Sequence, residues 1–531
     1  MHAPGGWATL VAVDARARLI GLLAAALGLR LWLAWSDLET LLLRVTSDDA
    51  FYYFEIARHL VAGDGASFDG TTPTNGFHPL WLMLSTGVQA IVHDPVTALH
   101  VSLSFGALLG TLTVALTAQV VQRLGGDEFA SLAAAAVVAF HPIMVIESVN
   151  GLETASAVCL IAAVTWLVSE LWQRQEAPTL RDAVVLGSAG GLMLLARTDT
   201  VFVWAGVLLF LALQRRNAER FKWILVAGGV SAAWGAPWLV WNLMRFGTVV
   251  QVSALAVAEP LRADYLAQHG DTFAVAFDRG WNVMQRAFGD TLVHLYLIPR
   301  PLDAWLGWLL AAGGLAALLS SGESRRRFGI LMVPGAGILL GLVIHAGIRW
   351  WLREWYFAPA GWLTAVCVGL VLVALRERLP RRAVDAAALF VVACVVGGWA
   401  APGWRPESPH RVQQLAGARW LARNTPTDAR LGAFNAGIYG YFSGRRVVNL
   451  DGVVNAEAYR ANRSGQLLYY VLAQRIEYVI DWRGTLPLLR CSENPAVRCE
   501  RVAVIGERLD NFAGSPVTVI RIRVAPPAAG R

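Results

Sequence analysis

The feature that most constrains this chain is a series of long apolar runs separated by short polar segments. Many of these runs approach the ~20 residues that a helix needs to cross a bilayer. Hydrophobic residues make up 56% of the 531 residues and charged residues only 16%, well below the roughly 25% charged content of soluble domains. The sequence therefore predicts a polytopic membrane protein that lies in a lipid bilayer.

The chain has a formal net charge of +7, and its basic residues lie in short loops between the apolar runs. This placement fits membrane topology better than nucleic-acid binding, so no nucleic-acid partner is expected. Arg16 and Arg18 precede the first apolar run and place the N-terminus in the cytoplasm. That run is too long for the core of a signal peptide, which indicates a retained anchor.

We predict an all-α membrane domain of about eleven transmembrane helices, with most of the basic loops on the cytoplasmic side. The predicted spans are Leu19–Trp35, Val96–Val121, Phe129–Ile146, Ala155–Trp172, Ala183–Ala196, Val201–Leu213, Trp223–Met244, Leu302–Leu319, Phe328–Ile348, Phe357–Leu375 and Val384–Ala400. A long outer loop is expected from about Arg245 to Pro301. Because the N-terminus is predicted to be cytoplasmic, an odd number of spans places the C-terminal part on the outer side of the membrane.

The first outer loop carries the most polar and aromatic sequence in the membrane part, Ser47–Trp81. Within it, residues 50–61 are predicted to form an amphipathic helix on the membrane surface, with a lipid-facing side formed by Phe51, Phe54 and Leu60. The run Pro79–Val92 has about 14 residues, a length typical of re-entrant or interfacial segments. If it crossed the bilayer, every later basic loop would lie outside.

The C-terminal tail alternates short apolar runs with polar segments and is predicted to be a small extracytoplasmic α/β domain. The two predicted domains are residues 1–402 and 403–531. Helices are expected at Arg411–Arg423 and Gln466–Arg475, and strands at Leu431–Phe434, Val447–Leu450, Tyr478–Asp481, Val502–Ile505 and Val517–Val524. Cys491 and Cys499 could form a disulfide if this domain faces an oxidising compartment.

The adjacent carboxylates Asp48 and Asp49 are the first candidates for chemistry. A bland explanation is a solvated helix N-terminus, in which Ser47 or Asp48 is the N-cap. A functional explanation is favoured because other outer segments supply polar groups that could converge on the same place. These groups are Arg58, His59, Asn75, His78, Glu147, Asn150, Glu153, Arg197, Asp199, Arg349 and Arg353.

Five short motifs together resemble the GT-C superfamily of integral-membrane glycosyltransferases. The chain is most similar to the protein O-mannosyltransferase, aminoarabinose transferase and mycobacterial arabinofuranosyltransferase branches, and the resemblance covers roughly residues 16–400. The motifs are Asp48-Asp-Ala-Phe-Tyr-Tyr-Phe, Asn75-Gly-Phe-His-Pro-Leu-Trp, Asn150-Gly-Leu-Glu-Thr, Ala196-Arg-Thr-Asp and Arg353-Glu-Trp-Tyr-Phe-Ala-Pro.

The resemblance implies an enzyme that moves a sugar from a polyprenyl-phosphate donor to an acceptor hydroxyl on the outer face of a bacterial cytoplasmic membrane. The acceptor classes are a glycan, a glycolipid or a protein. By resemblance, Asp48 is the general base, and Asp49 is its alternative or a partner that orients the acceptor or a cation. Arg353 is expected to hold the lipid phosphate.

The remaining expected substrate-binding residues surround this pair. Arg58 and His78 would support Arg353 at the phosphate, although the family often has lysine where this chain has His78. Glu153 and Asp199 are plausible sugar-binding carboxylates. The predicted substrate-binding set is Arg58, His59, Asn75, His78, Glu153, Arg197, Asp199 and Arg353.

No cofactor is expected. Adjacent carboxylates with histidines suit a divalent ion, but the resemblance implies metal-independent transfer. In the tail, residues 439–452 are read first as strand–turn–strand packing in which Asn449 and Asp451 satisfy turn donors. The alternative is contact between an acceptor glycan and the aromatic side chains.

Two other protein classes compete with the enzyme. The first is a transporter or lipid flippase. Two observations argue against it: the charged residues lie at the ends of the spans, and no paired broken helices are evident. The second is a non-catalytic membrane scaffold with an external binding domain, for which the carboxylate pair would be dispensable.

Overall fold

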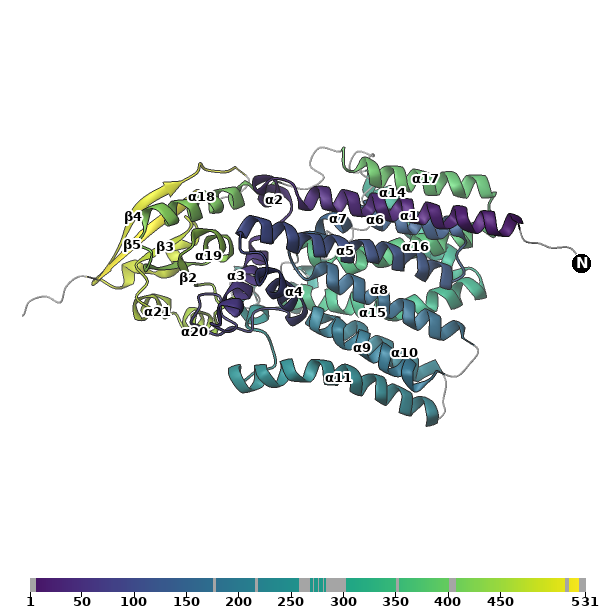
Figure 1. Cartoon of the computed structure of the whole chain (residues 1–531), viewed down its shortest axis with the longest axis horizontal. Coiled ribbons are helices and arrows are strands. Elements are labelled where there is room, and N and C mark those ends of the chain that lie inside the picture. Colours follow the sequence, from purple (N-terminus) through teal and green to yellow (C-terminus); the bar gives the residue numbers. More distant parts are fainter. Residues whose placement is uncertain are drawn as a thin grey trace, which may run out of the picture.

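A computed structural model describes residues 6–174, 178–214, 218–256, 268–270, 272–275, 277–279, 281–282, 302–349, 353–400, 407–510 and 515–524. Most of these residues form a bundle of long helices, and the C-terminal part forms a small sheet domain at one end of that bundle (Figure 1). The predicted boundary at residues 402 and 403 and most of the predicted loop from 245 to 301 lie outside the described residues.

Helices occur at the predicted spans, but fewer of the described helices than the predicted eleven have the length and composition of a membrane span. Within the described residues, five helices are long and apolar enough to cross a membrane, or up to seven if each of two bent pairs is one span. The helices of the bundle are α1 (Gly6–Ala34), α5 (Pro95–Arg123), α6 (Glu128–Phe140), α7 (Pro142–Ser148), α8 (Thr154–Gln173), α9 (Leu180–Ala196), α10 (Val201–Gln214), α11 (Ala218–Phe246), α14 (Leu302–Leu319), α15 (Gly322–Arg349), α16 (Ala358–Arg376) and α17 (Arg381–Gly397).

The break between α6 and α7 has a clear chemical cause. Pro142 has no N–H to donate to the carbonyl of Val138, and the two helices meet at 61°. The guanidinium of Arg30 replaces the lost donors, with NH2 2.9 Å from the Val138 carbonyl and NH1 2.9 Å from that of Ala139. Arg30 is fully buried and also donates to Ser148 Oγ. This arginine therefore stabilises the bend that leads to the loop carrying Glu153.

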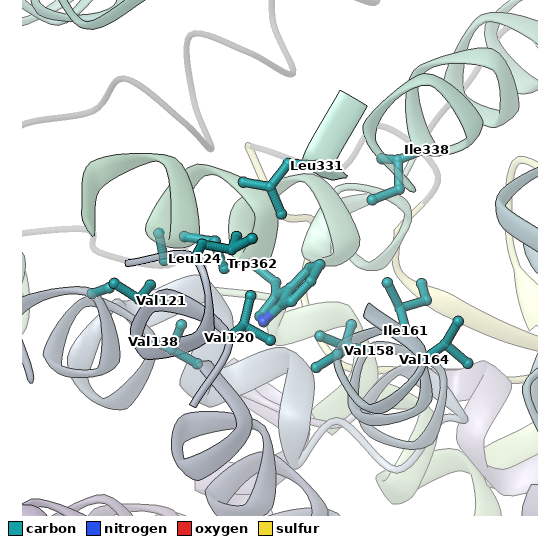
Figure 2. Packing of buried hydrophobic residues seen from close by; sticks show 14 of the residues in the cluster. Val120, Val121, Leu124, Val138, Val158, Ile161, Val164, Leu331, Ile338 and Trp362 are labelled. Atoms are coloured by element: carbon teal, nitrogen blue, oxygen red, sulfur yellow. The ribbon is translucent and has the colours of Figure 1, made fainter. Parts of the chain in front are cut away.

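The interior of the bundle is packed with small and branched apolar side chains. Trp362 is fully buried among residues of α5, α8 and α15 and donates from its indole to Thr117 Oγ1 at 3.1 Å (Figure 2). Burying the indole N–H requires such an acceptor. One hydrogen bond thus fixes the orientation of the Trp362 side chain within the bundle core.

The basic loops gather at the end of the bundle opposite to the C-terminal domain. Arg123 pairs with Glu170 at 2.8 Å, linking the ends of α5 and α8. Arg376 pairs with Asp127 and Asp385, and Arg18 pairs with Glu128 at 3.2 Å. The N-terminus lies toward this same end (Figure 1). The sequence-based prediction that these loops share one side is confirmed.

The first loop contains three short helices, α2 (Leu38–Arg44), α3 (Asp48–Ala62) and α4 (Pro79–Gln89). It begins and ends at the sheet-domain end of the bundle, since the carbonyls of Leu43 and Pro95 both accept hydrogen bonds from that domain. With 11 residues, α4 is too short to span a bilayer. The segment Pro79–Val92, which we predict not to cross the membrane, thus contains a helix shorter than a membrane span.

The prediction of a lipid-facing side on α3 is wrong. Phe51 and Phe54 are fully buried, because they pack against Tyr441 at ring-centroid distances of 5.5 and 5.8 Å. Phe442 also contacts Phe51 at 5.2 Å. The apolar side of α3 is covered by the C-terminal domain rather than by lipid.

The C-terminal domain is a five-stranded mixed sheet with helices on both faces. The strand order is β2-β1-β3-β5-β4, with the first three strands parallel and the last two antiparallel to their neighbours. The strands are β1 (Arg430–Ala433), β2 (Arg446–Asn449), β3 (Tyr478–Trp482), β4 (Val497–Ile505) and β5 (Val517–Val524). The helices are α18 (Pro409–Asn424), α19 (Gly437–Ser443), α20 (Ala456–Arg463) and α21 (Leu467–Ala473).

All five predicted strands are present, and the predicted helices correspond to α18 and α21. Two short helices, α19 and α20, were not expected from the sequence. The interpretation of residues 439–452 as strand–turn–strand is wrong in its first part, which is helical. Its turn is right: Asn449 Oδ1 accepts from Gly452 and Val454, and Asp451 Oδ1 accepts from Val453.

The alternative role of this segment as an exposed glycan platform is also excluded for its tyrosines. Tyr439 and Tyr441 have exposed fractions of 0% and 1%. Elsewhere in the domain, Cys491 and Cys499 are joined by a disulfide.

Candidate functional site

The centre of the candidate site is a buried polar network between the first loop and three later segments. Glu153 accepts a hydrogen bond from the Tyr53 hydroxyl at 2.8 Å. Its other oxygen lies 3.6 Å from His78 Nε2 and 3.9 Å from Arg197 NH1. Residues separated by more than a hundred positions therefore converge on one carboxylate.

The turn before α8 fixes the position of Glu153. Asn150 Oδ1 accepts from the Leu152 amide at 2.8 Å, and Gly151 has a φ of +85°. A Cβ at Gly151 would come within 2.8 Å of the Ala50 side chain on α3. The Gly151 carbonyl also accepts from the Trp81 indole at 2.8 Å. Only glycine fits here, because both the backbone angle and the close approach to α3 exclude a side chain.

His78 is held at the start of α4. Pro79 occupies the first turn of this helix, where its missing N–H costs nothing. The His78 amide donates to the Tyr53 hydroxyl at 3.1 Å, and its Nδ1 lies 3.2 Å from Gln251 Nε2. Both ring nitrogens are thus placed by neighbours from other segments.

Arg197 and Asp199 form the second half of the network. Arg197 Nε donates to both oxygens of Asp199, at 3.0 and 3.1 Å, and its guanidinium stacks on Tyr356 at 4.4 Å from the ring centroid. His345 Nε2 lies 2.9 Å from Asp199 Oδ2. The NH1 atom of Arg197 is buried and makes no hydrogen bond within the described residues. It faces the side of the network where Glu153 lies.

The carboxylate pair begins α3, next to the C-terminal domain. Asp48 is partly buried, and its two oxygens accept from the Ile438 and Gly437 amides at 2.8 and 3.2 Å. Burial raises the pKa of Asp48 to about 7, the Asp49 carboxylate adds to this, and the two amide hydrogen bonds oppose it. Asp49 is exposed.

Two further carboxylates lie near this pair in the C-terminal domain. Burial raises the pKa of Asp451 to about 8, and the charges of Asp49 and Asp481 raise it further. Burial also raises the pKa of Asp481, which accepts from the Phe434 and Asn435 amides. The described residues contain no group of three or more acidic, histidine or cysteine side chains arranged to hold a metal ion.

The structure brings His78, Glu153, Arg197 and Asp199 together, but it places the other predicted residues elsewhere. Arg58 stacks on Tyr441 at 4.5 Å and donates to its carbonyl. His59 contacts Glu55 at 3.5 Å and Asp64 at 2.8 Å. These two residues attach the end of α3 to its surroundings rather than joining the network.

Asn75 and Arg353 also lie outside the network. Asn75 Oδ1 accepts from the Val252 amide at 3.0 Å, so its side chain ties the first loop to the segment after α11. Arg353 is exposed at the start of a short 3-10 helix, Glu354–Tyr356. Burial lowers the pKa of His410 on α18 to about 4, and the charges of Arg411 and Arg353 lower it further. Arg353 therefore acts on a residue of the C-terminal domain.

Sequence reasoning missed four members of the network: Tyr53, Gln251, His345 and Tyr356. His345 carried a usable signal, because an ionisable residue within an apolar run is a functional candidate. Tyr53 and Tyr356 lay inside the quoted motifs without an assigned role. Gln251 lies in a loop, and nothing in the sequence connects it to His78.

Two family models match parts of the chain. Residues 79–241 match the family described as dolichyl-phosphate-mannose-protein mannosyltransferase, and residues 405–519 match a domain of unknown function. A comparison with curated proteins finds no significant sequence match.

Solved structures with a similar fold cover nearly the whole chain. The oligosaccharyltransferase AglB from Archaeoglobus fulgidus, solved with an inhibitory peptide and a dolichol-phosphate, has a TM-score of 0.56 at 13% identity over 90% of this chain and 70% of its own. ArnT from Cupriavidus metallidurans gives 0.54 at 11% identity over 98% of this chain and 100% of its own. Arabinofuranosyltransferase AftD from Mycobacteria gives 0.53 at 16% identity over 95% of this chain and 40% of its own.

The chain shares its fold with these membrane glycosyltransferases, and residues 79–241 match the mannosyltransferase family model, as the GT-C resemblance of the motifs led us to expect. The resemblance that the motifs indicated is therefore confirmed at the level of fold.

Proposed function

We propose that the protein is a glycosyltransferase that moves a sugar from a polyprenyl-phosphate donor to an acceptor hydroxyl at the outer membrane surface. The observation that carries this proposal is the buried Glu153 network, which Tyr53 joins to the helix α3 that carries the carboxylate pair. It combines hydrogen-bond acceptors for sugar hydroxyls with a guanidinium whose NH1 pairs with Glu153 by charge but makes no hydrogen bond within the described residues. In a purely structural ion pair, the buried N–H donors are normally all hydrogen-bonded.

The chemistry requires three kinds of group. One carboxylate of Asp48 and Asp49 accepts the proton of the acceptor hydroxyl as that oxygen attacks the anomeric carbon. Glu153 and Asp199 accept hydrogen bonds from the sugar. Cationic side chains hold the leaving phosphate: Arg197 and His78 from the network, with Arg353 approaching from the C-terminal side. The proposal involves no metal or organic cofactor.

Similar structures support the proposed donor class. ArnT from Cupriavidus metallidurans was solved with undecaprenyl phosphate, and the archaeal oligosaccharyltransferase with a dolichol-phosphate. We assign a lipid-phosphate sugar to this chain on that likeness and on the apolar bundle below the network. The acceptor is a glycan, a glycolipid or a protein.

The charge distribution supports an outward-facing site. The arginine-rich loops lie at the opposite end of the bundle, and such loops stay in the cytoplasm. The Glu153 network and the C-terminal domain then face outward across a bacterial cytoplasmic membrane. The disulfide between Cys491 and Cys499 suits that compartment.

Donor turnover by purified protein in detergent tests this function. A panel of polyprenyl-phosphate sugars is incubated with wild type and a mixture of glycan, glycolipid and protein acceptors, and release of polyprenyl phosphate is measured. Glu153→Gln should lower kcat/KM by about 10- to 100-fold, the value of a hydrogen bond to a charged group. Glu170→Gln, in an ion pair at the other end of α8, is the matched control and should remain near wild type.

Turnover without vesicles also separates the enzyme from the alternatives. A transporter or flippase needs two compartments, and a scaffold consumes no donor. If wild type releases no polyprenyl phosphate from any donor in the panel, the glycosyltransferase proposal is wrong.

A further inference from the structure

A side chain from the segment after α11 reaches the imidazole of His78. Gln251 is buried, with an exposed fraction of 7%, and the Asn75 side chain holds the backbone on both sides of it. Asn75 Oδ1 accepts from the Val252 amide at 3.0 Å, and Asn75 Nδ2 donates to the Val250 carbonyl at 3.4 Å. The Gln251 side chain is therefore presented to the first loop from a fixed backbone.

The orientation of the Gln251 amide follows from its first partner. The side-chain nitrogen lies 2.5 Å from the Phe77 carbonyl oxygen. Because a carbonyl oxygen can only accept a hydrogen bond, the group that faces it is the NH2 of the amide and not the amide oxygen. The same Nε2 lies 3.2 Å from His78 Nδ1. An amide nitrogen carries two N–H groups, so it can donate one to each of these partners.

A second donor points at the same ring nitrogen. The Thr198 amide donates to His78 Nδ1 at 3.4 Å. The Thr198 hydroxyl, also at 3.4 Å, can donate or accept and therefore fits either form of the ring. A proton on Nδ1 would face two other N–H groups, so Nδ1 is the acceptor of this imidazole. The single proton of a neutral imidazole is then on Nε2.

We propose that Gln251 is a positioning residue that holds His78 as the neutral tautomer with its proton on Nε2. Glu153 Oε1 lies 3.6 Å from this nitrogen, so the N–H serves the carboxylate that we assign to the sugar. This assignment rests on the proposed function and refines it. In the refined form, His78 contributes an N–H donor to the site rather than a positive charge.

The charges around the imidazole fit this assignment. The carboxylates of Glu153 and Asp199 act on His78, and both favour a positive charge on it. The Arg197 guanidinium already pairs with both carboxylates, since its NH1 lies 3.9 Å from Glu153 and its Nε 3.0 Å from Asp199. This pairing offsets part of their pull, and the two donors at Nδ1 oppose a second proton on the ring.

Nitrogen NMR of the full chain in detergent, with isotope-labelled histidine, reads the tautomer directly. The chain has 10 histidines, and the signal that is lost in His78→Gln belongs to His78. At neutral pH, wild type should show a proton on Nε2 and none on Nδ1. Gln251→Glu keeps the shape of the side chain but replaces the NH2 donor by an acceptor, so Nδ1 should gain a proton.

A glutamine outside the site provides the control for this measurement. Gln413 on α18 also donates from its Nε2 to a backbone carbonyl, that of Glu507, at 2.8 Å. Gln413→Glu therefore loses the same kind of bond as Gln251→Glu but has no histidine ring to affect through it. The His78 signal of this variant should match that of wild type.

Donor turnover tests whether the tautomer matters for transfer. Gln251→Leu removes both hydrogen bonds without adding a charge and should lower kcat/KM by about 3- to 10-fold, the value of one neutral hydrogen bond. Gln413→Leu should turn over the donor at the wild-type rate. Thermal unfolding of both variants separates a loss of position from a loss of fold.

Three results would overturn the assignment. The first is a proton on His78 Nδ1 in wild type, in either the other neutral tautomer or the doubly protonated ring, and this result needs no variant to fold. The second is a folded Gln251→Glu in which Nδ1 stays unprotonated. The third is a folded Gln251→Leu with wild-type turnover. If wild type consumes no donor, the proposed function fails, whereas NMR still decides whether Gln251 holds the tautomer.

Discussion

The hydroxyl of Tyr53 donates to Glu153 Oε2 at 2.8 Å and accepts from the His78 amide at 3.1 Å. One side chain on α3 thus joins the first loop to the loop before α8. The carboxylate pair is carried by the same helix, so this bond fixes the distance between the proposed base and the proposed sugar-binding carboxylate.

Tyr53→Phe should lower kcat/KM by about 10- to 100-fold, because it removes a hydrogen bond to a carboxylate and leaves the His78 amide without its acceptor. Tyr469→Phe, at a site with 63% exposure, is the control and should behave as wild type. Kinetics in detergent check this prediction. Equal turnover in both variants would show that Tyr53 does not position Glu153.

The close contact between α19 and α3 predicts a strong effect of one methyl group. Gly437→Ala should weaken docking of the C-terminal domain and lower the thermal unfolding temperature, because its Cβ would meet the Asp48 backbone oxygen at 2.2 Å. Gly87→Ala in α4 meets nothing within 4 Å and should be neutral or stabilising by about 0.4–1 kcal/mol. If the two variants unfold at the same temperature, the contact is not a constraint.

The raised pKa of Asp451 predicts that the stability of the folded protein depends on pH. Its pKa in the folded protein is about 8 and that of Asp48 about 7, both above the ~3.9 of an unfolded aspartate. The folded state therefore binds more protons than the unfolded state between these values, and stability falls as pH rises through 7 to 8. Thermal unfolding between pH 6.5 and 9 measures this, above the range in which His410 titrates.

Asp451→Asn should flatten that pH profile and raise the unfolding temperature above pH 8. The asparagine oxygen can still accept from the Val453 amide, which lies 2.9 Å from Asp451 Oδ1. A variant whose unfolding temperature declines with pH as steeply as that of wild type would contradict the role of Asp451.

Arg30 should be needed for the bent span rather than for chemistry. Arg30→Met leaves the carbonyls of Val138 and Ala139 without donors and should cost about 3 kcal/mol of stability. Arg18→Met, on the same helix but in an exposed ion pair with Glu128, should cost no more than about 1 kcal/mol. Thermal unfolding in detergent compares them, and equal losses would argue against the capping role of Arg30.

Much of the fold could be predicted from the sequence because hydrophobic periodicity reports burial directly. The non-spanning Pro79–Val92 segment followed from its length and from the basic loops, and the five C-terminal strands followed from short β-branched runs. The short helices α19 and α20 did not, because segments of seven and eight residues are too short for a helical period to stand out, and α19 also contains two glycines. The partner of Phe51 and Phe54 was also inaccessible, since lipid and a second domain demand the same apolar side chains.

The candidate site was predicted in part. Motif order indicated His78, Glu153, Arg197 and Asp199, and these residues do converge. The sequence could not distinguish Asp48 from Asp49, because a helix places adjacent residues on different faces and only tertiary contacts reveal which face meets which partner. The same limit applies to Arg353, which lies one turn from Tyr356 yet affects the pKa of His410 on α18.

The central claim is that a carboxylate pair at the start of α3 serves a lipid-linked sugar transferase. The most direct measurement is release of polyprenyl phosphate, in detergent, by wild type and by the double variant Asp48→Asn/Asp49→Asn. The account predicts turnover of at least one donor by wild type, and its loss in a double variant that unfolds at a similar temperature. Equal turnover by both proteins, or none by wild type, would contradict it.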